Sequence, residues 1–284
     1  MITASDLEMR HRLEAEVPPF RPVAVQLLHL AGDPTVSMRR IVDLLRTDPV
    51  LTGGLLRVAN SPLYASRREI SDVQHAVTYL GLDVIRSLAV TAAMRGLVDT
   101  RPNPLAVAFW RHSLATALTC RRMCRLAGAS SEYAYTAGLL HDVGQLGLMR
   151  VVPEYAQIVG KAVQRGERLI DVEARAFGID HCQAGRWLFS RWRLPLELQS
   201  VAGGHERPTP KATRDRGLIV LVHAASLVAE FMGFAVIPPA RDIELQDIAA
   251  AFEDEGRPGL LESLPALVEW ALLKVNGIEM SLSL

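Results

Sequence analysis

The sequence lacks the features that mark secreted, disulfide-stapled or membrane-spanning proteins. Its 284 residues include three cysteines, which are too few and too irregularly spaced for a disulfide framework or an all-cysteine zinc site. Residues 1–20 are charged and have no apolar signal core. The most apolar stretch, residues 218–229, contains His223 and is too short to cross a membrane. We therefore expect a cytoplasmic protein with no membrane contact.

The sequence also has no excess of either acidic or basic residues. Lys plus Arg and Asp plus Glu both number 31, so the formal net charge is zero. Composition therefore gives no electrostatic case for binding nucleic acid or an anionic membrane directly. Only Lys161, Lys211 and Lys274 are lysines, so nearly all cations are arginine. We interpret this preference as a bias in the base composition of the genome and not as phosphate recognition.

No segment alternates apolar and polar residues as a half-buried strand would, and the apolar periodicity is helical throughout. Residues 1–101 have the pattern of a small helical bundle. Pro102-Asn103-Pro104 favours an extended connector and is the best candidate for a domain boundary. We predict an all-α protein with a second helical subdomain over residues 102–235, which holds the candidate site, and a helical extension over residues 236–284.

The main candidate for a functional site is residues 137–148, an apolar helical stretch in which His141 and Asp142 are adjacent. Burying an unpaired charge is costly, so something must compensate this carboxylate. An imidazole nitrogen and two carboxylate oxygens can hold a divalent metal if further ligands arrive from elsewhere. The alternative is a neutral pair satisfied by an arginine or by helix amides. The histidines that could supply further ligands are His112, His181, His205 and His223.

Helix signals place two of these histidines. Asp180 precedes His181 and is expected to cap a helix over residues 182–192, with His181 in its first turn. Residues 203–208, Gly-Gly-His-Glu-Arg-Pro, are expected to form a loop after a short helix, which places His205 in that loop. The two glycines beside His205 would let the backbone approach a site closely.

The ordered histidines and three upstream segments resemble the HDOD domain, the HD-related output domain of bacterial signalling proteins. The upstream segments are Thr-Asp-Pro-Val-Leu-Thr at 47–52, Leu-Arg-Val-Ala-Asn-Ser-Pro-Leu-Tyr at 56–64, and residues 70–81. The resemblance runs from about residue 18 to about residue 233. It implies an N-terminal helical bundle packed on an HD-type helical domain, and it relates the chain to the HD superfamily of metal-dependent phosphohydrolases.

The resemblance also assigns roles to single residues. His112 matches the first histidine of the HD pattern, and His141 with Asp142 matches the central pair. His181 matches a histidine that the related HD-GYP cyclic-di-GMP phosphodiesterases carry further along. His205 matches the second histidine of their His-His-Glu motif. These matches imply that all five residues are metal ligands.

Other positions depart from the pattern. Gly204 replaces the first histidine of the His-His-Glu motif, Gln145 replaces the usual lysine, and no Gly-Tyr-Pro signature follows residues 207–208. His223 falls about where the superfamily's last metal-binding aspartate is expected. For His223, a hydrogen-bonded core histidine is the alternative to a ligand.

Two classes of function are compatible with these features. The resemblance and the missing catalytic signatures favour a signalling module that binds a partner protein or a small nucleotide ligand. The alternative is a metal-dependent phosphohydrolase acting on a nucleotide or cyclic dinucleotide, so an enzymatic role stays open. The phosphohydrolase requires a divalent metal, as one ion or as a pair bridged by Asp142, and the signalling module would use such a metal or another ligand as a structural element. A bare helical scaffold for protein contacts, in which the histidines are incidental, is a third and weaker possibility. Histidine-rich ligation suits Fe, Mn or Zn better than Mg.

Overall fold

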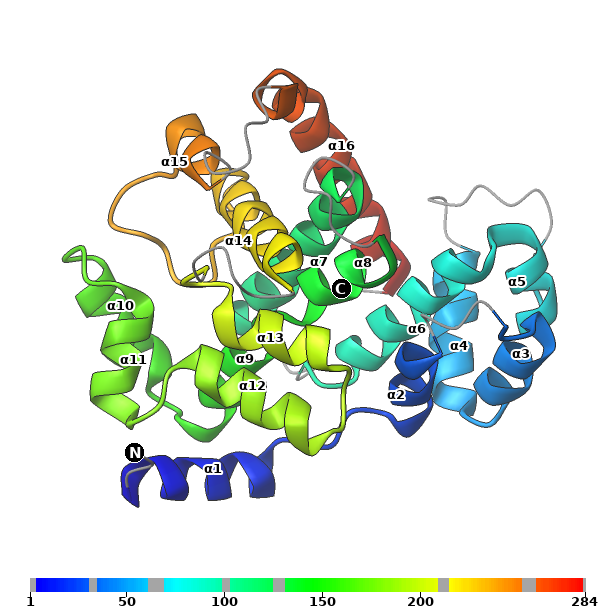
Figure 1. Cartoon of the computed structure of the whole chain (residues 1–284), viewed down its shortest axis with the longest axis horizontal. Coiled ribbons are helices and arrows are strands. Elements are labelled where there is room, and N and C mark those ends of the chain that lie inside the picture. The colour runs from blue at the N-terminus through cyan, green and yellow to red at the C-terminus, as the bar shows by residue number, and fades with distance from the viewer. Residues whose placement is uncertain are drawn as a thin grey trace.

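The regular elements in the described part of the chain are all α-helices. The computed structural model describes residues 4–30, 35–60, 69–98, 103–124, 131–208, 215–251 and 259–282. These ranges contain no β-strand, which confirms the predicted all-α class (Figure 1). Residue 102 of the predicted connector and residues 61–64 of the upstream motifs lie outside the described residues. The helices are α1 (Ala4–Glu16), α2 (Pro22–His29), α3 (Met38–Arg46), α4 (Pro49–Ala59), α5 (Val73–Leu80), α6 (Leu82–Arg95), α7 (Pro104–Met123), α8 (Ser131–Leu140), α9 (Val143–Val151), α10 (Tyr155–Val163), α11 (Leu169–Phe177), α12 (His181–Arg191), α13 (Leu196–Gly204), α14 (Arg216–Phe231), α15 (Leu245–Ala250) and α16 (Gly259–Leu282).

Helices α2 to α6 lie together on one side of the molecule (Figure 1). Ser37, Asp48 and Asp72 begin α3, α4 and α5 by accepting a hydrogen bond from a backbone N–H of the first turn. Gly81 separates α5 from α6 with a φ of 83°, a conformation that costs glycine little. This group of helices joins the rest of the protein where α6 packs on α8 and α4 packs on α16.

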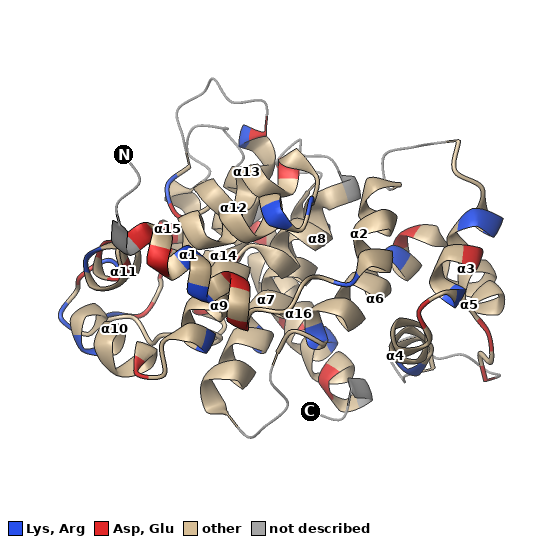
Figure 2. Ribbon diagram, turned by 90° about the horizontal axis from the view of Figure 1, so that it is seen from below, with Lys and Arg blue, Asp and Glu red and all other residues tan. Residues whose placement is uncertain are grey.

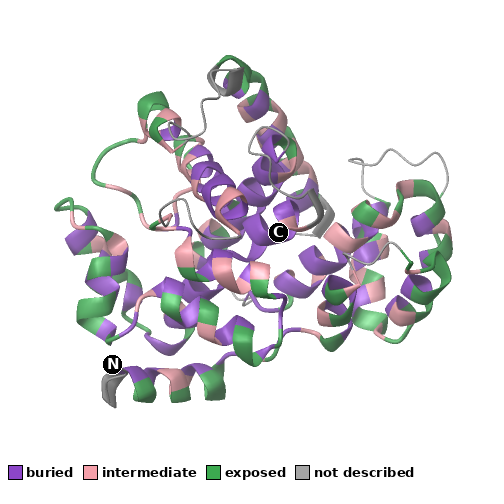
Figure 3. Cartoon of the chain, in the orientation of Figure 1, coloured by how far each residue is buried: buried purple, intermediate pink, exposed green. Residues whose placement is uncertain are grey.

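The long helix α7 is the centre of the second half of the chain. It packs against α8, α14 and α16, while α12 packs against α9 and α13. Figure 3 shows that buried residues are concentrated along α7, α8 and α14. Burial of apolar surface on these helices supplies most of the driving force for their association. The core of the protein therefore surrounds the segment that contains His141 and Asp142.

Two glycines allow these helices to approach one another very closely. A Cβ atom on Gly138 of α8 would lie 2.8 Å from the Cα atom of Ala117 on α7. A Cβ atom on Gly144 of α9 would lie 1.9 Å from the backbone oxygen of His181 and 2.4 Å from the backbone nitrogen of Gly185 on α12. No side chain fits at that distance. Gly144 therefore fixes how near α12 can lie to Asp142.

Both ends of the described chain pack on its middle. Helix α1 contacts α9, α11 and α12, and it runs beneath them in Figure 1. Helix α16 contacts α7 and α4. Residues 1–101 were expected to form one subdomain, yet α1 lies against helices of the second. The division at residues 1–101, 102–235 and 236–284 therefore stays a prediction.

Acidic and basic residues are interspersed along the helices, as the colours of the ribbon in Figure 2 show. This distribution agrees with the formal net charge of zero. Among the described helices, none combines the length and the apolar character needed to cross a membrane.

Candidate metal centre

Five of the six predicted site residues come from four separate places in the fold, and the sixth, His223, lies on α14. His112 lies in the middle of α7, while His141 and Asp142 form the short turn between α8 and α9. His181 is the first residue of α12, after the N-cap Asp180, and His205 is the C-cap of α13. Asp142 occupies the N-cap position of α9, but its side chain makes no capping hydrogen bond. An aspartate there usually caps, so this carboxylate is directed elsewhere.

The carboxylate of Asp142 lies at the centre of four imidazoles. Its Oδ2 atom is 3.2 Å from Nε2 of His141 and 3.5 Å from Nε2 of His112. Its Oδ1 atom is 2.9 Å from Nε2 of His205 and 3.7 Å from Nε2 of His181. Each oxygen of one carboxylate thus faces its own pair of histidines. The most exposed of the five residues is Asp142, at 7%.

The outer nitrogens of the rings determine which atoms face inward. Nδ1 of His141 lies 2.8 Å from the carbonyl oxygen of Gly138, and Nδ1 of His205 lies 3.2 Å from that of Val201. Carbonyl oxygens only accept, so each Nδ1 carries the proton. In the neutral ring, Nε2 then has a lone pair directed at Asp142. Among the described residues, Nε2 of His181, Nε2 of His205 and Oδ1 of Asp142 have no hydrogen-bond partner.

This donor set fits a divalent metal. Buried lone pairs of nitrogen and oxygen that face one another repel unless a cation or protons lie between them. His112, His141 and Asp142 form one group whose ligand atoms lie within 4.8 Å of one another; His181, His205 and Cys182 form another. Imidazole with carboxylate suits Zn, Fe and Mn. The geometry can therefore hold a metal on either side of Asp142.

Protons compete for the same atoms. Burial alone would lower the pKa of His181, but Glu173 and Cys182 outweigh it and the pKa lies well above its ordinary value. The pKa of His205 is also well above its ordinary value, because Cys182 and Asp142 outweigh burial. The pKa of Asp142 is held well below its usual range by His141 and His205, against the effect of burial. In the absence of a cation, protonation of the imidazoles would compensate the negative charges of the cluster.

Glu173 is a residue of the site that the sequence analysis missed. It is fully buried on α11. Its Oε2 atom accepts hydrogen bonds from Nδ1 of His181 at 2.6 Å and from the backbone nitrogen of His181 at 2.9 Å. The hydroxyl of Tyr155 donates to Oε1 at 2.5 Å. The sequence feature that could have identified Glu173 is its spacing, because it falls on the apolar stripe that contains Ile170 and Phe177.

Replacing Glu173 by glutamine is expected to weaken metal binding about 10- to 100-fold, the usual effect of removing the partner of a ligating histidine. The amide keeps the shape of the side chain but lacks the negative charge that orients His181 and raises its basicity. Metal titration of the purified variant measures the change. Tyr155→Phe, which keeps the ring stacked on Phe177, should have a smaller effect, and the exposed Glu154→Gln should have none. Unchanged affinity in a folded Glu173→Gln variant would contradict this role.

Helix α14 reaches the cluster through Ser226 and not through His223. The hydroxyl of Ser226 lies 3.3 Å from Nε2 of His112. His223 belongs to neither group of potential ligands. Burial lowers the pKa of His223, while Glu206 and the backbone of His205 act to raise it. His223 therefore neighbours Glu206 and the backbone of His205, and its assignment as a ligand stays a prediction without support from these contacts.

One turn beyond Ser226 on α14, Glu230 is a second carboxyl group that the sequence analysis missed. Burial and the negative charges of Glu206 and Asp142 raise the pKa of Glu230 to about 8. The sequence feature that could have identified Glu230 is its position as a lone acidic residue at the end of an otherwise apolar helix. Cys182 was likewise missed: its sulfur lies 3.8 Å from Nδ1 of His205. Its pKa is about 7, because His205 and His181 outweigh burial.

Comparison with known proteins agrees with the sequence resemblance. A structure of an HDOD domain protein of unknown function from Geobacter sulfurreducens superposes with a TM-score of 0.78 at 24% identity and covers 97% of each chain. A structure named "Putative phosphohydrolase" from Shewanella amazonensis superposes with a TM-score of 0.71 at 22% identity, covering 99% of this chain and 97% of that one. At these identities the likeness concerns the fold.

A curated relative from Treponema pallidum, named "Uncharacterized protein", is 22% identical over 222 residues. The match covers 76% of this chain and 43% of that relative. The chain therefore spans less than half the length of this relative. The family model described as the HDOD domain matches residues 17–208. That range is more than half of the sequence and contains Asp142 and the four histidines around it, so the chain belongs to the HDOD family.

Proposed function

We propose that the chain is a metal-containing signalling module, which acts by binding a partner protein or a small ligand. The observation that supports this proposal best is the cluster in which both oxygens of Asp142 face a pair of imidazoles. The proposed ligands are His112, His141, Asp142, His181 and His205. All five are almost completely buried, and closed sites of this kind are typical of structural metals.

The same geometry supports two ions bridged by one carboxylate. His112 and His141 would hold an ion beside Oδ2, and His181 and His205 would hold an ion beside Oδ1. Four imidazoles make Fe, Mn or Zn better candidates than Mg. Glu173 would fix the orientation and tautomer of His181 in either case.

We place the module in the cytoplasm, because its three cysteines are free and buried and thiols persist in a reducing compartment. The absence of a net charge favours a protein or small-molecule partner over nucleic acid.

Metal affinity is expected to fall steeply as the pH is lowered. A ligating imidazole must lose its proton, and the pKa values of His181 and His205 are both raised well above the ordinary value. Binding therefore releases protons at neutral pH, and apparent affinity should drop at least about tenfold per pH unit below pH 7. The depressed pKa of Asp142 means that its carboxylate adds nothing to this slope. Competition titrations between pH 6 and pH 8, at constant ionic strength, would measure it; a pH-independent affinity would contradict it.

A second function, hydrolysis of a nucleotide or cyclic dinucleotide, is favoured by the bridging position of Asp142. Bound metal ions would lower the pKa of water and neutralise charge on phosphate oxygens. The chain's own contribution would be to hold the ions with the five residues named above and to keep His181 oriented through Glu173. The similarity to a structure named as a phosphohydrolase adds to this alternative at the level of the fold.

One pair of measurements separates these functions. Elemental analysis of the protein as isolated is expected to find Fe, Mn or Zn in near-stoichiometric amount. The metal-loaded protein is then assayed with a nucleotide and with a cyclic dinucleotide beside an Asp142→Asn variant of equal helicity. The signalling proposal expects no difference in turnover between the parent protein and the Asp142→Asn variant. Hydrolysis that is lost in the variant would establish the enzyme instead, and a protein that takes up no metal after reconstitution would exclude both.

A further inference from the structure

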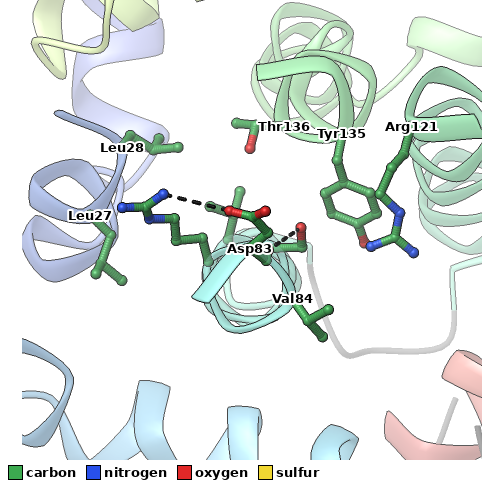
Figure 4. A pocket seen from close by; sticks show the side chains of 10 residues that line it. Leu27, Leu28, Asp83, Val84, Arg121, Tyr135 and Thr136 are labelled. Carbon is green, nitrogen blue, oxygen red and sulfur yellow. Dashed lines mark hydrogen bonds and ion pairs between the residues drawn. The ribbon is translucent and has the colours of Figure 1, made fainter. Parts of the chain in front are cut away.

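A cavity of about 520 Å³ lies at the junction between the N-terminal helices and the central ones. Helices α2 and α6 form two of its walls, and α7 and α8 form the others (Figure 4). Its size falls within the range of small-molecule sites. None of the residues that line it belongs to the cluster around Asp142.

One end of the cavity carries a positive charge, that of Arg121, which no described residue neutralises. The guanidinium of Arg121 lies 5.1 Å from the centre of the Tyr135 ring, and Figure 4 shows the two side chains next to each other. Among the described residues, no hydrogen bond or ion pair engages this guanidinium. Arginine offers five N–H donors in a planar fork that matches a phosphate or carboxylate. Arg121 is thus a half-buried anchor that has no acceptor within the described part of the chain.

The other charged residues of the cavity are already engaged. Arg86 donates to the carbonyl oxygen of Leu30 at 3.1 Å and lies 3.7 Å from the carboxylate of Asp83. Asp83 is almost fully exposed, so its repulsion of an anion is weakened by solvent and by Arg86. The anion-binding end of the cavity is therefore the Arg121 end.

The rest of the lining is apolar or capable of neutral hydrogen bonding. Leu27 and Leu28 of α2 lie on the flank of α6 opposite to Arg121 (Figure 4). Val90 of α6 and Thr136 of α8 are buried and also line the cavity. The Tyr135 hydroxyl is held by Thr91 at 2.8 Å, which fixes the ring beneath Arg121. A ligand would need an anionic group at one end and an apolar body that reaches α2.

We propose that this cavity binds a small organic anion, in which a phosphate or carboxylate group pairs with Arg121 and an apolar body lies against α2 and α6. The site is separate from the metal centre, and it does not depend on the function proposed above. Occupancy would bridge the N-terminal helices and α8, the helix that leads into His141 and Asp142.

The test uses the full chain and four probes: inorganic phosphate, phenyl phosphate, benzoate and AMP, each titrated by isothermal calorimetry. If the natural ligand is a phosphate, phenyl phosphate or AMP is expected to bind more tightly than inorganic phosphate. If the natural ligand is a carboxylate, benzoate is expected to bind more tightly than inorganic phosphate. Absence of binding by all four probes at millimolar concentrations would overturn the proposal.

Substitutions locate the binding. Arg121→Gln is expected to weaken the best probe about tenfold or more, since a hydrogen-bonded ion pair is lost. Arg122→Gln is the matched control, because Arg122 is its exposed neighbour and stacks over Trp270 outside the cavity. Ser87→Phe should abolish binding by filling the cavity while leaving every charge in place. Equal losses in Arg121→Gln and Arg122→Gln, or full binding in Ser87→Phe, would overturn the proposal.

Discussion

Replacing Asp142 by asparagine is expected to reduce metal binding by at least about 100-fold, more than the loss of a residue that only orients a ligand. The two oxygens of Asp142 face separate pairs of imidazoles. An amide leaves one oxygen, and its nitrogen can only donate to the pair it faces. One side of the centre would therefore lose its anion, and the bridge between the sides would be broken. Mass spectrometry of metals in the purified variant measures the loss directly.

The control for this substitution is Asp171→Asn, which removes a carboxylate that is half exposed and pairs with Arg207 at the surface. It should leave metal content unchanged. Circular dichroism should show equal helicity in both variants, because an exposed pair contributes little and the amide introduced at position 142 can still hydrogen-bond. Full metal occupancy in the Asp142→Asn protein would contradict the central role of this carboxylate.

Replacing Gly144 by alanine is expected to be among the most destabilising single changes in the chain, at about 4 kcal/mol or more. The added Cβ would lie 1.9 Å from the backbone oxygen of His181, and α12 would have to move away from α9. Backbone atoms cannot rotate out of the way as a side chain could. The same movement would carry His181 away from Asp142, so metal binding should fail together with stability. Chemical denaturation with and without added metal measures both effects.

Gly160→Ala provides the matched control for a glycine within a helix. Gly160 lies inside α10, and a Cβ there would meet nothing within 4 Å. The substitution should stabilise the protein by up to about 1 kcal/mol, because alanine has the higher helix propensity. A Gly144→Ala protein as stable as the parent would show that α9 and α12 do not approach as closely as described.

Much of the fold could be predicted from local signals. Apolar periodicity predicted helices throughout, and Asp180 was correctly expected to cap a helix with His181 in its first turn. His205 was expected in a loop and is the C-cap of α13. The order of the histidines, read through the family resemblance, selected five residues that the fold brings together. Each of these inferences depends on residues that are near in sequence or on a known pattern.

The rest depended on packing between helices, which periodicity does not specify. His223 and Ser226 are three residues apart on an apolar helix, about 4.5 Å along its axis, and only the docking of α14 on α7 decides that Ser226 meets His112. Glu173 could not be paired with His181 without knowing that α11 folds back on α12. Gly144 carries no signal of its contact at all, because a close approach is a property of two segments.

The contacts of α1 and α14 bear on how this protein should be shortened for experiments. The family match covers residues 17–208, which excludes α1 at residues 4–16 and α14 at residues 216–231. Leu13 of α1 is completely buried and lies beside Gly147 of α9, and α14 supplies the hydroxyl beside His112. A fragment cut at the family limits would expose the flank of α9 that packs on α1 and the face of α7 that packs on α14. The smallest unit suitable for expression is therefore longer than the range that matches the family, and it extends at least from α1 to the end of α14.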